Sequence, residues 1–244
     1  MQPVEIVCSS RATRQGWLAL PSQPGPRPAV VVIHDITGMR ADTRRHCARF
    51  AEEGYVALAP DLYDGGSPRC VVGTLTGMLR GRGEAFDVIR ASRELLAARP
   101  DVDAARIGVV GFCMGGGFAL LAAADDAFAV AAPFYGTVPR SADRLSGLCP
   151  TIAQFGAQDL VFRRSARRLK RHLEQLDVPH AWHLREGVGH SFMNDHPDVM
   201  FRLSRFGPMR AGYDAETESE AWGAMLAFFS EHLGASPPAQ PAES

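Results

Sequence analysis

The stretch Arg106-Ile-Gly-Val-Val-Gly-Phe-Cys-Met-Gly-Gly-Gly-Phe-Ala-Leu120 decides the fold of this chain. It opens with an apolar, β-branched run at 107–110 that favours a buried strand, and residues 118–124 are compatible with a helix. Glycines flank Cys113 between the two, as expected where a sharp turn brings a strand and a helix too close for Cβ atoms. The pattern predicts a nucleophile elbow with the thiol of Cys113 at its tip.

Strands and helices alternate on both sides of this stretch. Apolar runs typical of buried strands occupy residues 29–33, 55–59, 129–134, 151–155 and 181–184. Apolar stripes at helical spacing occupy residues 42–53, 84–98, 163–176 and 215–233, with Asp42 as the expected N-cap of the first helix. The alternation predicts a single-domain α/β fold over residues 1–234, with a mostly parallel sheet of about seven or eight strands and helices on both faces. Residues 235–244 are expected to form a disordered tail, and residues 193–213 have no clean period.

Charge and composition exclude several classes of function. The formal net charge is −1 without a basic block or an acidic tail, so neither nucleic acid nor a membrane is expected as a partner. The N-terminus lacks a signal pattern and no run of 18 apolar residues occurs, which points to a cytoplasmic protein. The five cysteines are scattered, so neither a disulfide framework nor a metal site is expected. No cofactor is expected, and the sequence leaves the oligomeric state open.

Two loops after later strands supply partners for Cys113. Asp159 follows the strand at 151–155 and His190 follows the strand at 181–184, so both are expected at the sheet edge where the elbow lies. The chain order nucleophile, acid, base is that of the α/β-hydrolase scaffold. In these roles His190 accepts the thiol proton and Asp159 orients the imidazole. Taken singly, Asp159 could instead cap the next helix, and His190 could be a surface histidine.

The same scaffold predicts where the oxyanion of an attacked carbonyl is held. One N–H comes from the residue after the nucleophile, Met114, and another from the loop after an earlier strand. By position the second donor is Ile36, in the loop His34-Asp-Ile-Thr-Gly38. These residues together predict a cysteine-nucleophile hydrolase that acts on small esters or lactones through a thioester acyl-enzyme.

Four motifs occur in a characteristic order: the loop at 34–38, Ala-Pro-Asp-Leu-Tyr at 59–63, the Gly-Phe-Cys-Met-Gly-Gly elbow, and Gly-His-Ser-Phe at 189–192. Over roughly residues 15–234 the chain resembles the dienelactone hydrolase family. The resemblance implies an α/β-hydrolase fold and a carboxymethylenebutenolidase-like activity, the opening of an unsaturated lactone to a dienoic acid. It also implies that Asp35, in the place of a family glutamate, interacts with the nucleophile; taken singly, Asp35 could instead simply shape the loop.

The chain differs from the family at the residues that would hold the substrate. Family members bind a substrate carboxylate with arginines, one of them four residues after the catalytic histidine, where this chain has Asn194. Arg80 or Arg82 could supply the other arginine, and Tyr135 and Phe192 could line the site or pack in the core. The alternatives are hydrolysis or acyl transfer on a different small carboxylic ester, or a non-catalytic thiol-sensing or binding protein of this fold.

Overall fold

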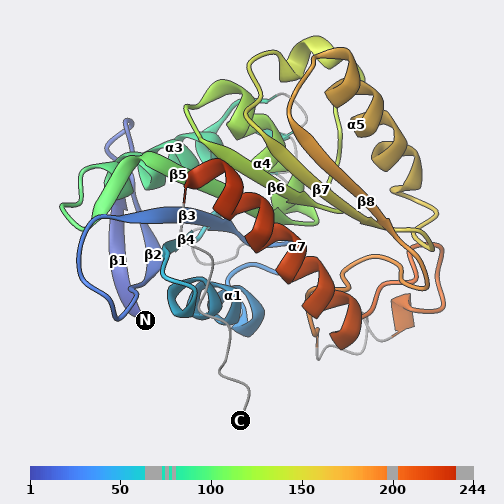
Figure 1. Ribbon diagram of the computed structural model, residues 1–244, viewed down its shortest axis with the longest axis horizontal. Coiled ribbons are helices and arrows are strands. Elements are labelled where there is room, and N and C mark those ends of the chain that lie inside the picture. The colour runs from blue at the N-terminus through green and yellow to red at the C-terminus, as the bar shows by residue number, and fades with distance from the viewer. Residues whose placement is uncertain (64–72, 75–76, 79–80, 197–202, 235–244) are drawn as a thin grey trace.

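The computed structural model describes residues 1–63, 73–74, 77–78, 81–196 and 203–234 (Figure 1). A single eight-stranded sheet runs through them in the order β1-β2-β4-β3-β5-β6-β7-β8. Its strands are β1 (Gln2–Val7), β2 (Thr13–Ala19), β3 (Arg27–Ile33), β4 (Val56–Pro60), β5 (Val102–Phe112), β6 (Val130–Phe134), β7 (Thr151–Gly156) and β8 (His180–Arg185). Strands β3 to β8 pair in parallel, and β1 and β2 are antiparallel additions at one edge. The predicted α/β fold with a mostly parallel sheet of seven or eight strands is confirmed.

Helices cover both faces of the sheet. Helices α1 (Ala41–Glu52) and α7 (Ala215–Leu233) lie on one face, and α3 (Glu84–Ala97), α4 (Met114–Asp125) and α5 (Arg163–Gln175) lie on the other (Figure 1). A short 3-10 helix, η1 (Ala142–Leu145), packs against α4 and α5. Helix α4 is buried over residues 114–123, because it is enclosed by the sheet and its neighbours. The helix that follows the elbow is therefore the most central of the molecule.

Two details of the predicted elements change in the structure. The prediction that Asp42 caps α1 is wrong: the helix begins at Ala41, and Asp42 lies buried in its first turn, where it pairs with Arg45. Strand β5 begins before its apolar run, because Val102 pairs with Arg27 of β3. No helix within the described ranges is both long and apolar enough to cross a membrane.

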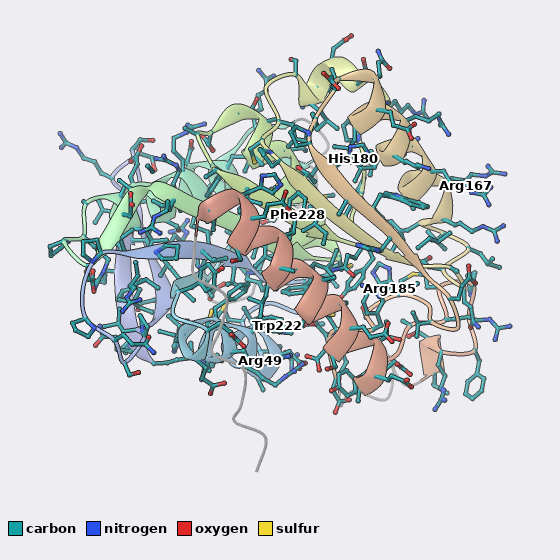
Figure 2. The ribbon with its side chains drawn as sticks, viewed as in Figure 1. Arg49, Arg167, His180, Arg185, Trp222 and Phe228 are labelled. Atoms are coloured by element: carbon teal, nitrogen blue, oxygen red, sulfur yellow. The ribbon has the colours of Figure 1, made fainter. Side chains whose placement is uncertain are left out.

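Helices α1 and α7 are joined side by side across their face of the sheet. The guanidinium of Arg49 on α1 lies 4.1 Å from the ring centroid of Trp222 on α7, a contact that can be followed in Figure 2. Arg45 and Arg49 also both pair with Glu218 of α7. Because α1 begins three residues after Gly38, these contacts fix one end of the loop that carries Ile36.

Candidate active site

Cys113 occupies a strained turn between β5 and α4. Its φ of 54° and ψ of −114° are unfavourable for a residue with a side chain, and its N–H donates to the carbonyl of Phe134 at 3.1 Å. A Cβ added to Gly111 would lie 2.0 Å from the carbonyl oxygen of Gly115, and one added to Gly115 would lie 2.5 Å from that of His34. The elbow therefore requires these glycines, and the partly exposed thiol sits at the N-terminus of α4.

Asp159 and His190 form a buried pair. The His190 Nδ1 lies 2.7 Å from Asp159 Oδ2, and each residue is 1% exposed. The other carboxylate oxygen, Oδ1, accepts the N–H groups of Val161 at 3.1 Å and Phe162 at 3.0 Å. Asp159 thus both orders the turn before α5 and fixes His190, so the two interpretations of this residue describe the same geometry.

The surroundings of His190 favour its cation. Its ring lies between those of Tyr135 and Phe162, each at 4.8 Å between centroids. Burial alone would lower the pKa of His190, but the charge of Cys113 and the hydrogen bond to Asp159 outweigh it and raise the pKa to about 9. The buried Nε2 has no hydrogen-bond partner of normal geometry among the described residues.

The segment 203–214, for which the sequence shows no period, braces His190. The N–H of His190 donates to the carbonyl of Met209 at 2.9 Å, and the N–H of Gly212 donates to the carbonyl of His190 at 2.9 Å. Beside Asp159, the N–H of Leu160 donates to the carbonyl of Pro208 at 3.0 Å. These bonds hold the loops after β7 and β8 together, and backbone contacts of this kind leave no side-chain pattern in the sequence.

The loop after β3, which carries Ile36, runs close to the start of α4, since the carbonyl of His34 approaches Gly115. No hydrogen bond leads from the N–H of Ile36 or of Met114 to another described residue, so both donors are available to an oxyanion. The loop is fastened by His34, whose Nδ1 donates to the carbonyl of Asp35 at 2.7 Å and whose Nε2 accepts the N–H of Leu62 at 3.1 Å. Burial lowers the pKa of His34, so the ring is neutral, as these two bonds require.

A family model of the dienelactone hydrolases matches residues 15–233. The chain belongs to the dienelactone hydrolase family. A "Putative carboxymethylenebutenolidase" of Synechocystis sp. is 28% identical over 240 residues, which cover 89% of this chain and 92% of the relative. A "Probable 2-oxo-3-(5-oxofuran-2-ylidene)propanoate lactonase" of Bradyrhizobium sp is 27% identical over 246 residues, which cover 91% of this chain and 90% of the relative. The solved structure of m3DLH matches with a TM-score of 0.80 at 26% identity, over 95% of this chain and 98% of that one. The protein is therefore an enzyme of the hydrolase class, as the sequence predicts.

In this dienelactone hydrolase family member, Asp35 is engaged away from the nucleophile. Its Oδ1 accepts the N–H of Thr37 at 2.8 Å and the Thr37 hydroxyl at 2.5 Å. Its Oδ2 accepts the Nδ2 of Asn194 at 2.7 Å and lies 3.1 Å from His196 Nε2. Burial alone would raise the pKa of Asp35, but the hydrogen bonds from His196 and Thr37 lower it to about 2. No hydrogen bond joins Asp35 to Cys113 among the described residues, and its carboxylate oxygens are bonded within the loop and to Asn194.

The residues predicted to touch the substrate lie mostly beneath the surface. Tyr135 and Phe192 are fully buried and pack on each other at 5.1 Å, with Tyr135 against the ring of His190. Asn194 is 3% exposed and bonded on both sides of its amide. Arg82 is exposed in the loop before α3, and Arg80 lies outside the described residues. Tyr135 and Phe192 therefore pack in the core beside His190, whereas Asn194 is among the residues that line a cavity between the loop after β8 and the segment 203–214.

The carboxyl edge of the sheet brings together a thiol, an imidazole held by a carboxylate and two N–H groups. These are the kinds of group that acyl transfer to a sulfur nucleophile requires. Within the described ranges, no group of three His, Cys, Asp or Glu side chains is arranged to hold a metal ion.

Proposed function

We propose that this protein is a cysteine-dependent hydrolase of small carboxylic esters or lactones that works through a thioester acyl-enzyme. The observation that carries the proposal is the buried pair of His190 and Asp159, which lies at the same sheet edge as Cys113 on its strained turn. The pKa of His190 rises to about 9 although burial opposes it, because Cys113 and Asp159 favour the imidazolium. A neighbouring imidazolium favours the thiolate of a cysteine, and the thiolate is the form that attacks a carbonyl carbon.

Acylation uses each group once. The thiolate of Cys113 adds to the carbonyl carbon, and the oxyanion that forms accepts the N–H groups of Ile36 and Met114. When the tetrahedral intermediate collapses, the bond to the alcohol oxygen breaks and His190 gives its Nε2 proton to that oxygen. The products are a thioester on Cys113 and a neutral histidine; with a lactone the alcohol stays attached to the acyl group.

Deacylation reverses the roles. Neutral His190 takes a proton from water, and the hydroxide adds to the thioester carbonyl in the same oxyanion site. Collapse breaks the carbon–sulfur bond and releases the acid. The thiolate and the imidazolium are restored, so the cycle consumes one ester and one water and yields one acid and one alcohol. Asp159 keeps its charge throughout and stabilises the cation.

The direct test is Cys113→Ala, with Cys149→Ala as its matched control. Cys149 is also a free, partly buried cysteine, and burial raises its pKa to about 12, which makes it unreactive. We expect Cys113→Ala to abolish turnover of p-nitrophenyl acetate, and mass spectrometry of the quenched wild type to find an acetyl group on Cys113. The control should behave as wild type. Turnover that survives in folded Cys113→Ala would refute the proposal.

The charge around the site favours uncharged substrates. Asn194 stands where relatives that bind a carboxylate carry an arginine, and its amide is used by Asp35 and His46. Asp35 itself is ionised and belongs to the loop at 34–38 that carries Ile36, which we call the oxyanion loop. Among the described residues near that loop, this carboxylate would oppose a substrate anion, so a neutral ester or lactone suits the site better than a carboxylate-bearing dienelactone.

A matched pair of substrates tests this preference. We expect p-nitrophenyl butyrate to be turned over with a higher kcat/KM than the mono-p-nitrophenyl ester of succinic acid, which has a similar length and one negative charge. The gap should narrow at high salt if it is electrostatic. A preference for the anionic ester, or for dienelactone over neutral lactones, would contradict the inference about substrate charge while leaving the cysteine mechanism intact.

A further inference from the structure

Asn194, the only asparagine of the chain, joins two parts of the site that are far apart in sequence. Its Nδ2 donates to Asp35 Oδ2 at 2.7 Å, and its Oδ1 lies 3.0 Å from Nε2 of His46. Asp35 begins the oxyanion loop and His46 lies on α1, which follows that loop. We call these three residues the Asn194 bridge. All three side chains are buried.

The direction of the hydrogen bonds in the bridge is fixed by its charged end. A carboxylate only accepts, so the amide nitrogen must face Asp35 and the amide oxygen must face His46. His46 must then donate from Nε2, which leaves its Nδ1 without a proton. This agrees with the lowered pKa of His46, about 4, for which burial is the main cause, and with the buried Nδ1 that has no partner among the described residues. The bridge therefore has one stable arrangement of protons.

Asn194, the middle residue of the bridge, also belongs to the turn that follows the catalytic histidine. The N–H of Asn194 donates to the carbonyl of Ser191 at 3.0 Å, which closes a turn directly after His190. Next to it, Nη2 of Arg45 on α1 donates to the carbonyl of Met193 at 2.9 Å. Two consecutive residues of α1, Arg45 and His46, thus hold the turn, and Asn194 reaches from it to the oxyanion loop.

We propose that Asn194 is a positioning residue that sets the distance between the oxyanion loop and the catalytic histidine. This inference rests on the proposed function, because it concerns the N–H of Ile36 and the imidazole of His190 acting on one carbonyl group. Asp35 links Asn194 to the rest of the loop, because its Oδ1 accepts two hydrogen bonds from Thr37, the residue after Ile36. Asn194 touches neither the thiol nor the substrate in this role, so it affects only steps that need the oxyanion site.

Two rates for the same thiol separate this role from a general structural one. Acylation by p-nitrophenyl acetate needs the oxyanion site, whereas alkylation of Cys113 by iodoacetamide needs only the thiolate and its histidine. In Asn194→Leu, which has a similar volume and no polar atoms, we expect acylation to fall by about 10²-fold, the usual effect of misplacing a catalytic group by an ångström. Alkylation and its pH profile should stay within about threefold of wild type on the same reasoning.

The matched control is Gln154→Leu. Gln154 is also a fully buried amide that is hydrogen-bonded on both sides. Its Nε2 donates to the carbonyl of Ala221 at 2.8 Å, and its Oε1 accepts from Arg185, a residue labelled in Figure 2. It lies away from the oxyanion loop, so its loss should change stability but not the ratio of acylation to alkylation. If Asn194→Leu also leaves this ratio unchanged, or lowers both rates equally, the positioning role is refuted.

Exchanging the carboxylate and the amide of the bridge, Asp35 and Asn194, gives a rescue test. Asp35→Asn alone and Asn194→Asp alone should each lower acylation, because two amides or two carboxylates then face each other. In the double variant, the amide at position 35 can still accept from Thr37 and donate to the carboxylate at position 194. That carboxylate in turn still accepts from His46. The contact with His196 is lost in Asp35→Asn and in the double variant alike, which makes the single variant its control.

We expect the double variant to acylate at least about tenfold faster than either single variant, and a rate no better than theirs would refute the bridge. Failure of the proposed function gives a different result. In that case the wild type itself does not acylate on Cys113, and the ratio cannot be formed for any variant.

Discussion

Removing either Cys113 or Asp159 should return the pKa of His190 to its ordinary range. In the intact protein the pKa lies at about 9 rather than 6.5, a difference worth about 3 kcal/mol in favour of the cation. Burial is the largest single influence and favours the neutral ring; the charge of Cys113 comes next, and then the hydrogen bond to Asp159. Because burial opposes the raised pKa, both partners contribute to keeping it high.

The direction of the change follows from these opposing influences. Each variant removes one of the two partners that raise the pKa of His190 and leaves burial, the largest single influence, which lowers it. We therefore expect each variant to bring the pKa of His190 to within about one unit of 6.5.

Histidine NMR measures this directly. The chain has eight histidines, so the His190 signal is assigned by its loss in His190→Gln and is followed from pH 5 to 10 in ¹³C-histidine-labelled protein. The Cys149→Ala variant should titrate as the wild type does. A midpoint that stays near 9 in both Cys113→Ala and Asp159→Asn would refute the coupled thiolate–imidazolium pair.

Three further predictions concern stability. Gly115→Ala should unfold the elbow or abolish ester turnover, because its Cβ would lie 2.5 Å from backbone oxygens. Its control, Gly223→Ala on α7, meets open space and should raise the free energy of unfolding, followed by thermal denaturation, by up to about 1 kcal/mol. Equal effects of the two variants would contradict the close approach at Gly115. His46, with a pKa lowered to about 4, stabilises the fold above pH 6.5 and loses this contribution as the pH falls from 6.5 to 4, by up to about 3 kcal/mol. Urea unfolding of His46→Gln should lack that pH dependence, and a variant that keeps it would contradict the assignment. Glu218→Gln removes the shared partner of Arg45 and Arg49 and should lower the free energy of unfolding in urea by about 1–3 kcal/mol. An unchanged free energy would show that these ion pairs do not stabilise the fold.

Much of the architecture can be predicted from the sequence because it depends on local patterns. The run before Cys113 is apolar and β-branched on both faces, and its glycines are needed by contacts within a few residues. The apolar stripe of residues 215–233 likewise predicts α7, whose start is marked by Asp214, a side chain that accepts the N–H of Thr217 at 2.9 Å. The order of Cys113, Asp159 and His190 follows from the same strand–loop alternation.

The features that escape prediction depend on contacts between distant backbones or between buried polar groups. Residues 203–214 brace His190 with carbonyl and N–H groups, which every residue type possesses, so no composition or period marks them. His34 and His46 are buried and neutral, and a histidine in such a place looks in sequence like any other. Asn194 can be recognised as a departure from the family, but its orientation follows only from the carboxylate that it faces.

The width of the sheet explains why such contacts matter here. The oxyanion loop follows β3 and the catalytic histidine follows β8, and four strand spacings separate these strands, about 19 Å at roughly 4.8 Å each. Strand pairing alone therefore cannot bring Ile36 and His190 to one carbonyl group. The loops must close that distance, and the segment 203–214 and Asn194 are the contacts that hold them closed. An exchange at position 194 thus changes the charge of the site and the span of its two halves together, so charge and geometry at this position have to be varied separately, as the bridge exchange does.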